Sequence, residues 1–218
     1  MFVPIKLDID ARANWEPYDA DGADIGWRPR FDSWGVGIRS MSPLTLHPVL
    51  YSDSLASNDR GRFGFPAVPR PAHGQVAQGE ANRLGVVCLA ISDGVVHLTR
   101  ANSNNLLGAQ IAPTGAGGVE YTVGCERDTL REIVERSIIA EVWEESGITV
   151  HKLEYLGTAL SVERGYKPEC FFRTFDFTVV LNGDQTFNEF TDGTFTAPFA
   201  AVPAEVPPIL AHLLALSG

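Results

Sequence analysis

The sequence predicts a mixed α/β fold in which helix packs on sheet, preceded by an N-terminal extension. Two observations lead to this prediction. From residue 84 onward the pattern gives a strand hairpin, a long helix, further strands and a short helix, whereas residues 1–83 are irregular and rich in Pro, Gly, Asp and Arg. Strands and helices in this order indicate a sheet that buries a face against helices. We therefore divide the chain into an extension of open role, residues 1–83, and a second domain, residues 84–218.

Apolar runs and turn residues predict the first elements of the second domain. Residues 84–91 are an apolar run typical of a buried strand, and residues 95–99 form the returning strand of a hairpin. Asp93-Gly94 between them is a two-residue turn that favours hairpins. Residues 111–118 are rich in glycine, so we expect a loop whose backbone approaches a ligand closely or takes positive φ.

Two end signals bound the long helix. Thr129 and Glu132 are three residues apart, which fits a capping box at its start. Gly147 stands where a left-handed residue commonly ends a helix. Strands are expected at residues 148–150, 153–162 and 171–181 and, in the extension, at residues 3–9 and 45–51; a long loop is expected at residues 58–80 and a short helix at residues 208–216.

The composition excludes some classes of partner. With 17 Lys and Arg against 27 Asp and Glu the net charge is −10, so duplex nucleic acid, which requires a basic face, is not an expected partner. A small phosphorylated substrate stays compatible because bound metal ions supply positive charge. Without a signal-peptide core or an uninterrupted apolar span, we expect no membrane partner and a cytoplasmic location. The cysteines lack C-x-x-C spacing and are expected to be buried free thiols: Cys88, Cys125 and Cys170.

Three carboxylates gather at the end of the long helix. Glu141, Glu144 and Glu145 fall within roughly a 100° arc of its surface, where like charges repel. They continue the apolar stripe formed by Leu130, Val134 and Ile138, and a bare carboxylate on a core-facing stripe is costly. A hard divalent cation with oxygen ligands resolves this conflict, so we interpret the cluster as a metal site. The alternative is a solvated acidic helix end, which the helix dipole disfavours.

The helix sequence also resembles the Nudix box. The residues that carry the resemblance are Glu132, Glu141, Val142, Glu144, Glu145, Gly147 and Ile148. The resemblance covers roughly residues 84–218 and implies a Nudix-like α/β/α sandwich with a mixed sheet. It implies Mg²⁺-dependent hydrolysis of a diphosphate linkage in a nucleoside diphosphate derivative or related small metabolite, with Mn²⁺ as a substitute. A homodimer is a further expectation, because dimers are common in that family.

The resemblance assigns roles to individual residues. It implies that Glu141, Glu144, Glu145 and the backbone near Gly118 hold the metal, and that Glu144 and Glu145 act in catalysis. The family often places its general base on a later loop, where the candidates are Glu163, Glu169, Glu189 and Asp192; Glu189 is the one we select. Gly117, Arg164 and Lys167 are the expected substrate contacts. The alternatives are ordinary loop glycines for Gly117 and Gly118, a plain solvated hairpin for Arg164 and Lys167, and a purely structural role for Glu132 in the capping box.

Two departures from the box support a second hypothesis. Ala140 stands where the family has an Arg, and Glu126 stands where it has a Gly. A catalytically impaired Nudix-like domain that binds a nucleotide or regulates is therefore the alternative to an enzyme. A third hypothesis makes residues 1–83 an interaction module with the enzyme as its accessory. Trp27 and Trp34 in that segment are expected to be packing residues, with stacking on a base as the alternative.

Overall fold

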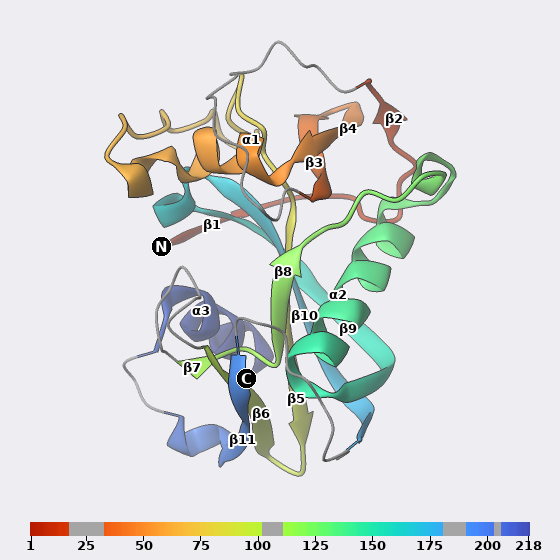
Figure 1. The fold of residues 1–218 in the computed structure, drawn as a ribbon, viewed down its shortest axis with the longest axis vertical. Helices are drawn as coiled ribbons and strands as arrows, with labels where there is room; N and C mark the ends of the chain where they lie inside the picture. Colours follow the sequence, from red (N-terminus) through yellow and green to blue (C-terminus); the bar gives the residue numbers. More distant parts are fainter. Residues whose placement is uncertain (18–32, 102–110, 181–190, 203–205) are drawn as a thin grey trace. The chain divides into compact units, whose positions relative to one another are not determined.

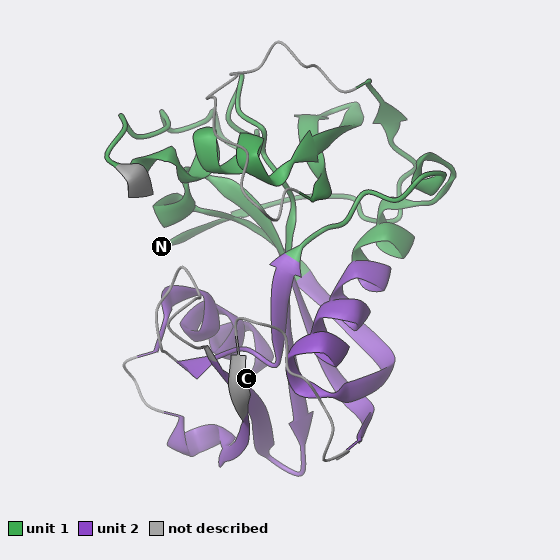
Figure 2. Cartoon of the chain, viewed as in Figure 1, with its two compact units in different colours: residues 1–85, 118–134, 157–170 green, residues 86–117, 135–156, 171–218 purple. Residues whose placement is uncertain are grey.

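The computed structural model describes residues 1–17, 33–101, 111–180, 191–202 and 206–218 (Figure 1). These residues form two compact units. Unit 1 comprises residues 1–85, 118–134 and 157–170, and unit 2 comprises residues 86–117, 135–156 and 171–218. The chain passes repeatedly from one unit to the other, as the two colours of Figure 2 show. The N-terminal segment therefore shares unit 1 with two later segments.

Unit 2 contains most of the main sheet. Its strands, or the parts of them that it holds, are β5 (Gly85–Ser92), β6 (Val95–Ala101), β7 (Ile111–Ala112), β8 (Gly115–Gly118), β9 (Ile148–Ser161), β10 (Lys167–Val179) and β11 (Thr191–Pro198). Together with β1 (Phe2–Ile5), the strands hydrogen bond in the order β1-β9-β10-β5-β6-β11, with β7 on β6 and β8 on β5. The β5–β6 hairpin turns at Asp93 and Gly94, both with positive φ (51° and 74°), as a primed two-residue turn requires.

Helices lie on both sides of the sheet in unit 2 (Figure 1). The helix α2 (Leu130–Ser146) buries Ile138 and Val142. The helix α3 (Pro208–Ser217) buries Leu210 and Leu213, and its His212 ring packs edge-on against Phe171 of β10 at 4.9 Å between centroids. This helix–sheet–helix layering confirms the predicted α/β/α sandwich.

Unit 1 has a small sheet of its own in the order β2-β4-β3. Its strands are β2 (Asn14–Trp15), β3 (Trp34–Met41) and β4 (Leu44–Leu50). The helix α1 (Tyr51–Ala56) and the 3₁₀ turn η1 (Asn58–Phe63) follow β4. Unit 1 also contains the 3₁₀ turns η2 (Cys125–Arg127) and η3 (Val162–Arg164), whereas η4 (Phe199–Ala201) lies in unit 2. The strand β1 pairs antiparallel with β9, so the first residues extend the main sheet. The strands expected at residues 3–9 and 45–51 correspond to β1 and β4, whereas β2 and β3 were not predicted.

Several local predictions are confirmed. The Thr129 amide donates to Glu132 Oε2 at 2.7 Å and the Glu132 amide to Thr129 Oγ1 at 3.3 Å, which is the expected capping box. Gly147 ends α2 with φ of 65°. All three cysteines are buried free thiols. The prediction of a loop at residues 111–118 is wrong, because this segment contains the short strands β7 and β8.

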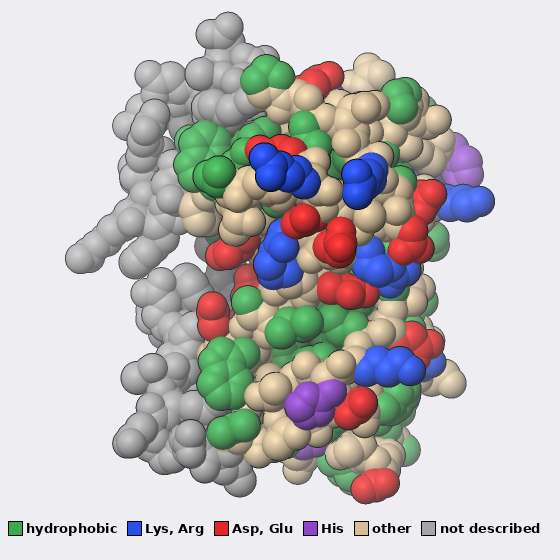
Figure 3. Space-filling model, turned by 90° about the vertical axis from the view of Figure 1, so that its right-hand side faces the viewer, with side chains coloured by type: hydrophobic (Ala, Val, Ile, Leu, Met, Phe, Trp, Pro, Cys, Tyr) green, Lys and Arg blue, Asp and Glu red, His purple; other side chains and the backbone are tan. Residues whose placement is uncertain are grey.

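No helix in the described ranges is long and apolar enough to cross a membrane. On the face of the molecule shown in Figure 3, Asp and Glu side chains are interspersed with Lys and Arg side chains. Opposite charges placed in this way give neither sign an extended patch on that face.

The acid stability of the chain is expected to depend on His47. This side chain is 4% exposed and lies over Gly37 of the neighbouring strand, where a Cβ would stand 2.6 Å from Nε2. Burial, and then the nearby Arg39, lowers the pKa of His47 from 6.5 to about 4. Since the imidazole takes up a proton more readily in the unfolded chain, stability is full above pH 6.5 and is lost as the pH falls toward 4.

The loss is about 3 kcal/mol once His47 is charged, and His47→Gln should flatten the decline. Urea unfolding at about pH 7.5 and about pH 4.5 measures it, with the exposed His73→Gln as the matched control. If His47→Gln keeps the same pH dependence as His73→Gln, the decline has another source.

Candidate metal and substrate site

The strand β8 packs against the second half of α2 through glycine. A Cβ built on Gly115 would meet Val142 Cα at 2.7 Å. A Cβ built on Gly117 would meet Glu141 Oε1 at 1.7 Å and its Cδ at 2.0 Å. Any side chain at these positions would displace the helix or its carboxylate. Glycine at position 115 is therefore required for close approach to the helix backbone, and this approach brings the strand backbone to the Glu141 carboxylate.

Glu145 is the buried acid of this site. Its side chain is 7% exposed, and the Ala116 amide of β8 donates to its Oε2 at 2.9 Å. A charge-assisted hydrogen bond of this kind favours the ionised carboxylate and fixes its orientation. We name the group formed by residues 115–117, Glu141 and Glu145 the β8–α2 site; all of its members belong to unit 2.

The three helix carboxylates do not share one environment, which corrects the sequence prediction. Glu145 is buried, Glu141 is half-buried and Glu144 is exposed. The apolar stripe continues from Ile138 to Val142 and Glu145, because i+4 and i+7 positions follow the packed line of the helix. Among the described residues, no group of three or more His, Cys, Asp or Glu side chains is arranged to hold a metal ion. The site offers two packed carboxylates rather than the three that were predicted.

Gly118 lies in unit 1, against a different side chain. A Cβ on Gly118 would meet Arg83 Cζ and Nη2 at 2.8 Å. Arg83 is 6% exposed, donates to Ser33 Oγ at 3.2 Å, and its guanidinium lies 5.2 Å from the centre of the Tyr51 ring. Sequence reasoning did not single out Arg83, because its position before a strand carries no motif. The predicted metal contact of the Gly118 backbone stays a prediction.

Arg164 and Lys167 occupy a buried ion-pair cluster instead of a solvated rim. Arg164 makes a two-point pair with Asp59 at 2.8 and 2.9 Å and reaches Glu169 Oε1 at 3.2 Å. Lys167 Nζ donates to the same Glu169 oxygen at 2.7 Å. The side chains of Asp59, Glu169 and Lys167 are 0%, 2% and 3% exposed. A Cβ on Gly85 would collide with Glu169 and Lys167, so this glycine makes room for the pair.

This placement corrects two sets of predicted roles. Lys167 is enclosed and paired, so it does not form an exposed phosphate contact, and Arg164 already binds two carboxylates. Of the candidate bases, Glu169 belongs to the same cluster and Glu163 pairs with the N-terminal amine at 3.0 Å. Glu189, with the side chain of Asp192, lies outside the described residues. The sequence around Glu163 suggested a surface hairpin because it is rich in charge, whereas its charges neutralise one another inside the unit.

Enlarging Gly117 should weaken the β8–α2 site selectively. Gly117→Ala places a methyl group on the Glu141 carboxylate, so the acid has to move or the strand has to shift. We expect Mn²⁺ affinity to fall by roughly tenfold, measured by electron paramagnetic resonance titration. The control is Gly94→Ala in the hairpin turn, where an added Cβ meets nothing within 4 Å but the positive φ costs stability. Equal Mn²⁺ affinity in both variants would mean that the Glu141 geometry does not matter to the metal.

Solved structures similar to this chain include Nudix hydrolases. A MutT NUDIX hydrolase from Burkholderia pseudomallei is 14% identical, over 62% of this chain and 98% of that chain, with a TM-score of 0.48. A NUDIX hydrolase from Nitrosomonas europaea is 12% identical, over 62% of this chain and 87% of that chain, with a TM-score of 0.48. An ADP compounds hydrolase is 17% identical, over 88% of this chain and 86% of that chain, with a TM-score of 0.45.

No protein-family model matches this sequence, and no curated protein matches it. The similarities to the three solved structures, at 12–17% identity and TM-scores of 0.45–0.48, do not assign an activity to this chain.

Proposed function

We propose that this chain is a Nudix-type enzyme that hydrolyses a diphosphate linkage in a nucleoside diphosphate derivative or related small metabolite, with Mg²⁺ as its cofactor. The observation that carries the proposal is the packing of the Glu141 carboxylate on the bare backbone of Gly117. A glycine strand that receives a carboxylate, beside the buried and oriented Glu145, provides a set of hard oxygen donors. It also lies on the helix segment whose sequence resembles the Nudix box.

The donors of the β8–α2 site fit Mg²⁺. This ion commonly keeps several waters and takes only one or two protein carboxylates, with substrate phosphates completing its shell. Glu141 and Glu145 satisfy that requirement even though the described residues contain no three-ligand group. Glu144, one turn from Ala140 and exposed, is available to a ligand approaching from solvent. Mn²⁺ prefers similar oxygen ligands and serves as the expected substitute.

The residues of the site have different roles in the proposed reaction. When bound, Mg²⁺ would act as a Lewis acid toward the phosphate oxygens and lower the pKa of the attacking water. The Ala116 amide holds one Glu145 oxygen, which fixes the carboxylate in a single orientation. Contact with Gly117 restricts Glu141 in the same way. The exposed Glu144 is the group on α2 that is placed to accept a proton from water, and Glu189 is the alternative base.

The competing function is nucleotide binding without turnover. Ala140 and Glu126 replace the Arg and the Gly of the box, and only two of its three carboxylates pack toward β8. These differences should weaken metal binding more than they alter the fold. A binding domain would retain affinity for the substrate and lose the rate.

A hydrolysis panel separates the two functions. The full chain is incubated with ADP-ribose, dinucleoside polyphosphates, NADH and oxidised nucleotides, with Mg²⁺, with Mn²⁺ or with a chelator. Metal-dependent release of a phosphorylated product from one of them supports the enzyme. Saturable binding of one compound without turnover supports the binding domain, and neither binding nor turnover contradicts both.

A further inference from the structure

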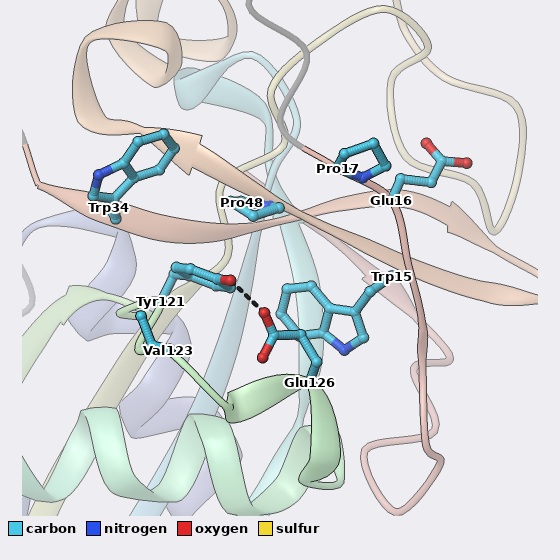
Figure 4. A pocket seen from close by; sticks show the side chains of 8 residues that line it. All are labelled: Trp15, Glu16, Pro17, Trp34, Pro48, Tyr121, Val123 and Glu126. Carbon is cyan, nitrogen blue, oxygen red and sulfur yellow. Dashed lines mark hydrogen bonds between the residues drawn. The ribbon is translucent and has the colours of Figure 1, made fainter.

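Unit 1 contains a pocket of about 540 Å³ with aromatic and acidic walls (Figure 4). Three aromatic side chains and two carboxylates line it together with two prolines and a valine: Trp15, Trp34, Tyr121, Glu16 and Glu126. The lining residues come from β2 and the two residues after it, from the start of β3, from β4 and from the segment that precedes α2. All of them belong to unit 1, whereas the β8–α2 site belongs to unit 2. The pocket and the β8–α2 site therefore belong to different units.

Neutral donors hold the Glu126 carboxylate at the pocket wall. The Tyr121 hydroxyl donates to Glu126 Oε1, and the Gly124 amide donates to Oε2 at 3.0 Å. The hydrogen bond from Tyr121 is the main reason that the pKa of Glu126 is lowered, and it raises the pKa of Tyr121 to about 12. At neutral pH the carboxylate is thus ionised. Its two hydrogen-bond donors are neutral, and the charge of nearby Arg127 contributes least to lowering its pKa. Glu16, by contrast, pairs with Arg39 at 3.4 Å.

The rings of Trp15 and Tyr121 flank this carboxylate, and Trp34 lies farther along the pocket wall (Figure 4). The Trp15 and Tyr121 rings have centroids 5.7 Å apart and are tilted by 55°, and Figure 4 shows the Glu126 carboxylate directed toward Tyr121 between them. Trp34, which was expected to be a packing residue, is 43% exposed at the pocket. Aromatic faces carry negative electrostatic potential, so they attract cations in addition to apolar groups. The rings and the carboxylate therefore favour the same sign of ligand charge.

We propose that this pocket binds an organic cation, with a quaternary ammonium group as the best-fitting head. Such a group is weakly hydrated and sheds its water at little cost, so the rings hold it through cation–π contact while Glu126 supplies the counter-charge. A phosphate or a nucleotide would bring negative charge against Glu126 and Glu16 and is disfavoured. A neutral base would stack on the rings but would leave the carboxylate without a cationic partner in the ligand.

A cationic ligand and a neutral ligand of nearly the same shape test the proposal directly. In 3,3-dimethylbutan-1-ol a carbon replaces the quaternary nitrogen of choline, so the two ligands have nearly the same volume but only choline is charged. Ligand-observed NMR titration of the full chain should give roughly millimolar binding of choline and about tenfold weaker binding of the alcohol. Equal binding of both, absence of saturable binding by either, or tighter binding of uncharged adenosine overturns the proposal.

Variants assign the binding to the pocket. Glu126→Gln keeps the shape of the side chain and removes its charge, and it should weaken choline roughly fivefold to tenfold while leaving the alcohol unchanged. Trp15→Leu should weaken both probes. The control Glu163→Gln removes a surface charge outside the pocket and should change neither affinity. If Glu126→Gln and Glu163→Gln bind choline with the same affinity, choline does not bind beside Glu126, and the proposal is overturned.

Discussion

Replacing Glu145 by glutamine is expected to lower Mg²⁺-dependent hydrolysis by roughly a hundredfold. The amide has the size of the carboxylate, and its oxygen still accepts the hydrogen bond from the Ala116 amide, so the fold around β8 is preserved. What is lost is the negative charge that a hard cation requires. Steady-state rates with the substrate found in the hydrolysis panel measure the effect.

A matched control separates the site from the net charge. Glu154→Gln also removes one negative charge, but its exposed carboxylate pairs with Arg173 away from β8. This variant should keep the wild-type rate and the wild-type Mn²⁺ affinity. If Glu145→Gln hydrolyses the substrate as fast as Glu154→Gln does, the proposed role of Glu145 is wrong. If its rate falls while Mn²⁺ affinity is unchanged, Glu145 acts on the water or substrate rather than on the metal.

The largest effect on stability is expected from Glu169→Gln. Glu169 accepts from both Arg164 and Lys167 inside unit 1. Its neutralisation leaves the buried Lys167 and the partly buried Arg164 with the Asp59 carboxylate as their nearby counter-charge. Removing one partner of a buried ion pair costs about 3–5 kcal/mol, whereas an exposed pair contributes about 1 kcal/mol or less. Urea unfolding should therefore show a deficit several times that of Glu154→Gln.

The pH dependence of this deficit provides an internal check. Burial, and then the neighbouring Arg164, lowers the pKa of Lys167 from 10.5 to about 8. Because the amine holds its proton less tightly in the folded chain, the cost of burying its charge is full below pH 8 and is relieved as the pH rises toward 10.5. Glu169 raises this pKa, so Glu169→Gln lowers it further, and the deficit should shrink at about pH 9.5. The double variant Lys167→Met/Glu169→Gln should lose less than the sum of its single changes.

Much of the fold follows from local signals in the sequence. The turn at Asp93-Gly94, the capping box at Thr129 and Glu132, and the end of α2 at Gly147 each depend on a few neighbouring residues. Such signals are readable without knowledge of the rest of the chain. The small sheet of unit 1 was only partly predictable, because β2 and β3 are stabilised by pairing with β4, which is remote in sequence from β2.

The candidate site was predictable in its residues but not in their environments. The helix spacing identified Glu141 and Glu145, yet it also grouped the exposed Glu144 with them, because angular position alone does not reveal what packs on the helix. The burial of Lys167 could not be predicted from the sequence for a related reason. Its cluster depends on Asp59, which is remote in sequence and pairs with Arg164, and on the space left by Gly85; these come together only through tertiary structure.

The contact of β8 with α2 limits which substitutions this site tolerates in evolution. Any substitution at either glycine adds a Cβ. At Gly115 this atom would meet the backbone of Val142, and at Gly117 it would meet the end of the flexible Glu141 side chain. A change at Gly117 is therefore compatible with the helix if Glu141 moves or is shortened, as in Glu141→Asp, whereas a change at Gly115 requires the strand or the helix backbone to shift. Of the two glycines, Gly115 thus tolerates substitution least.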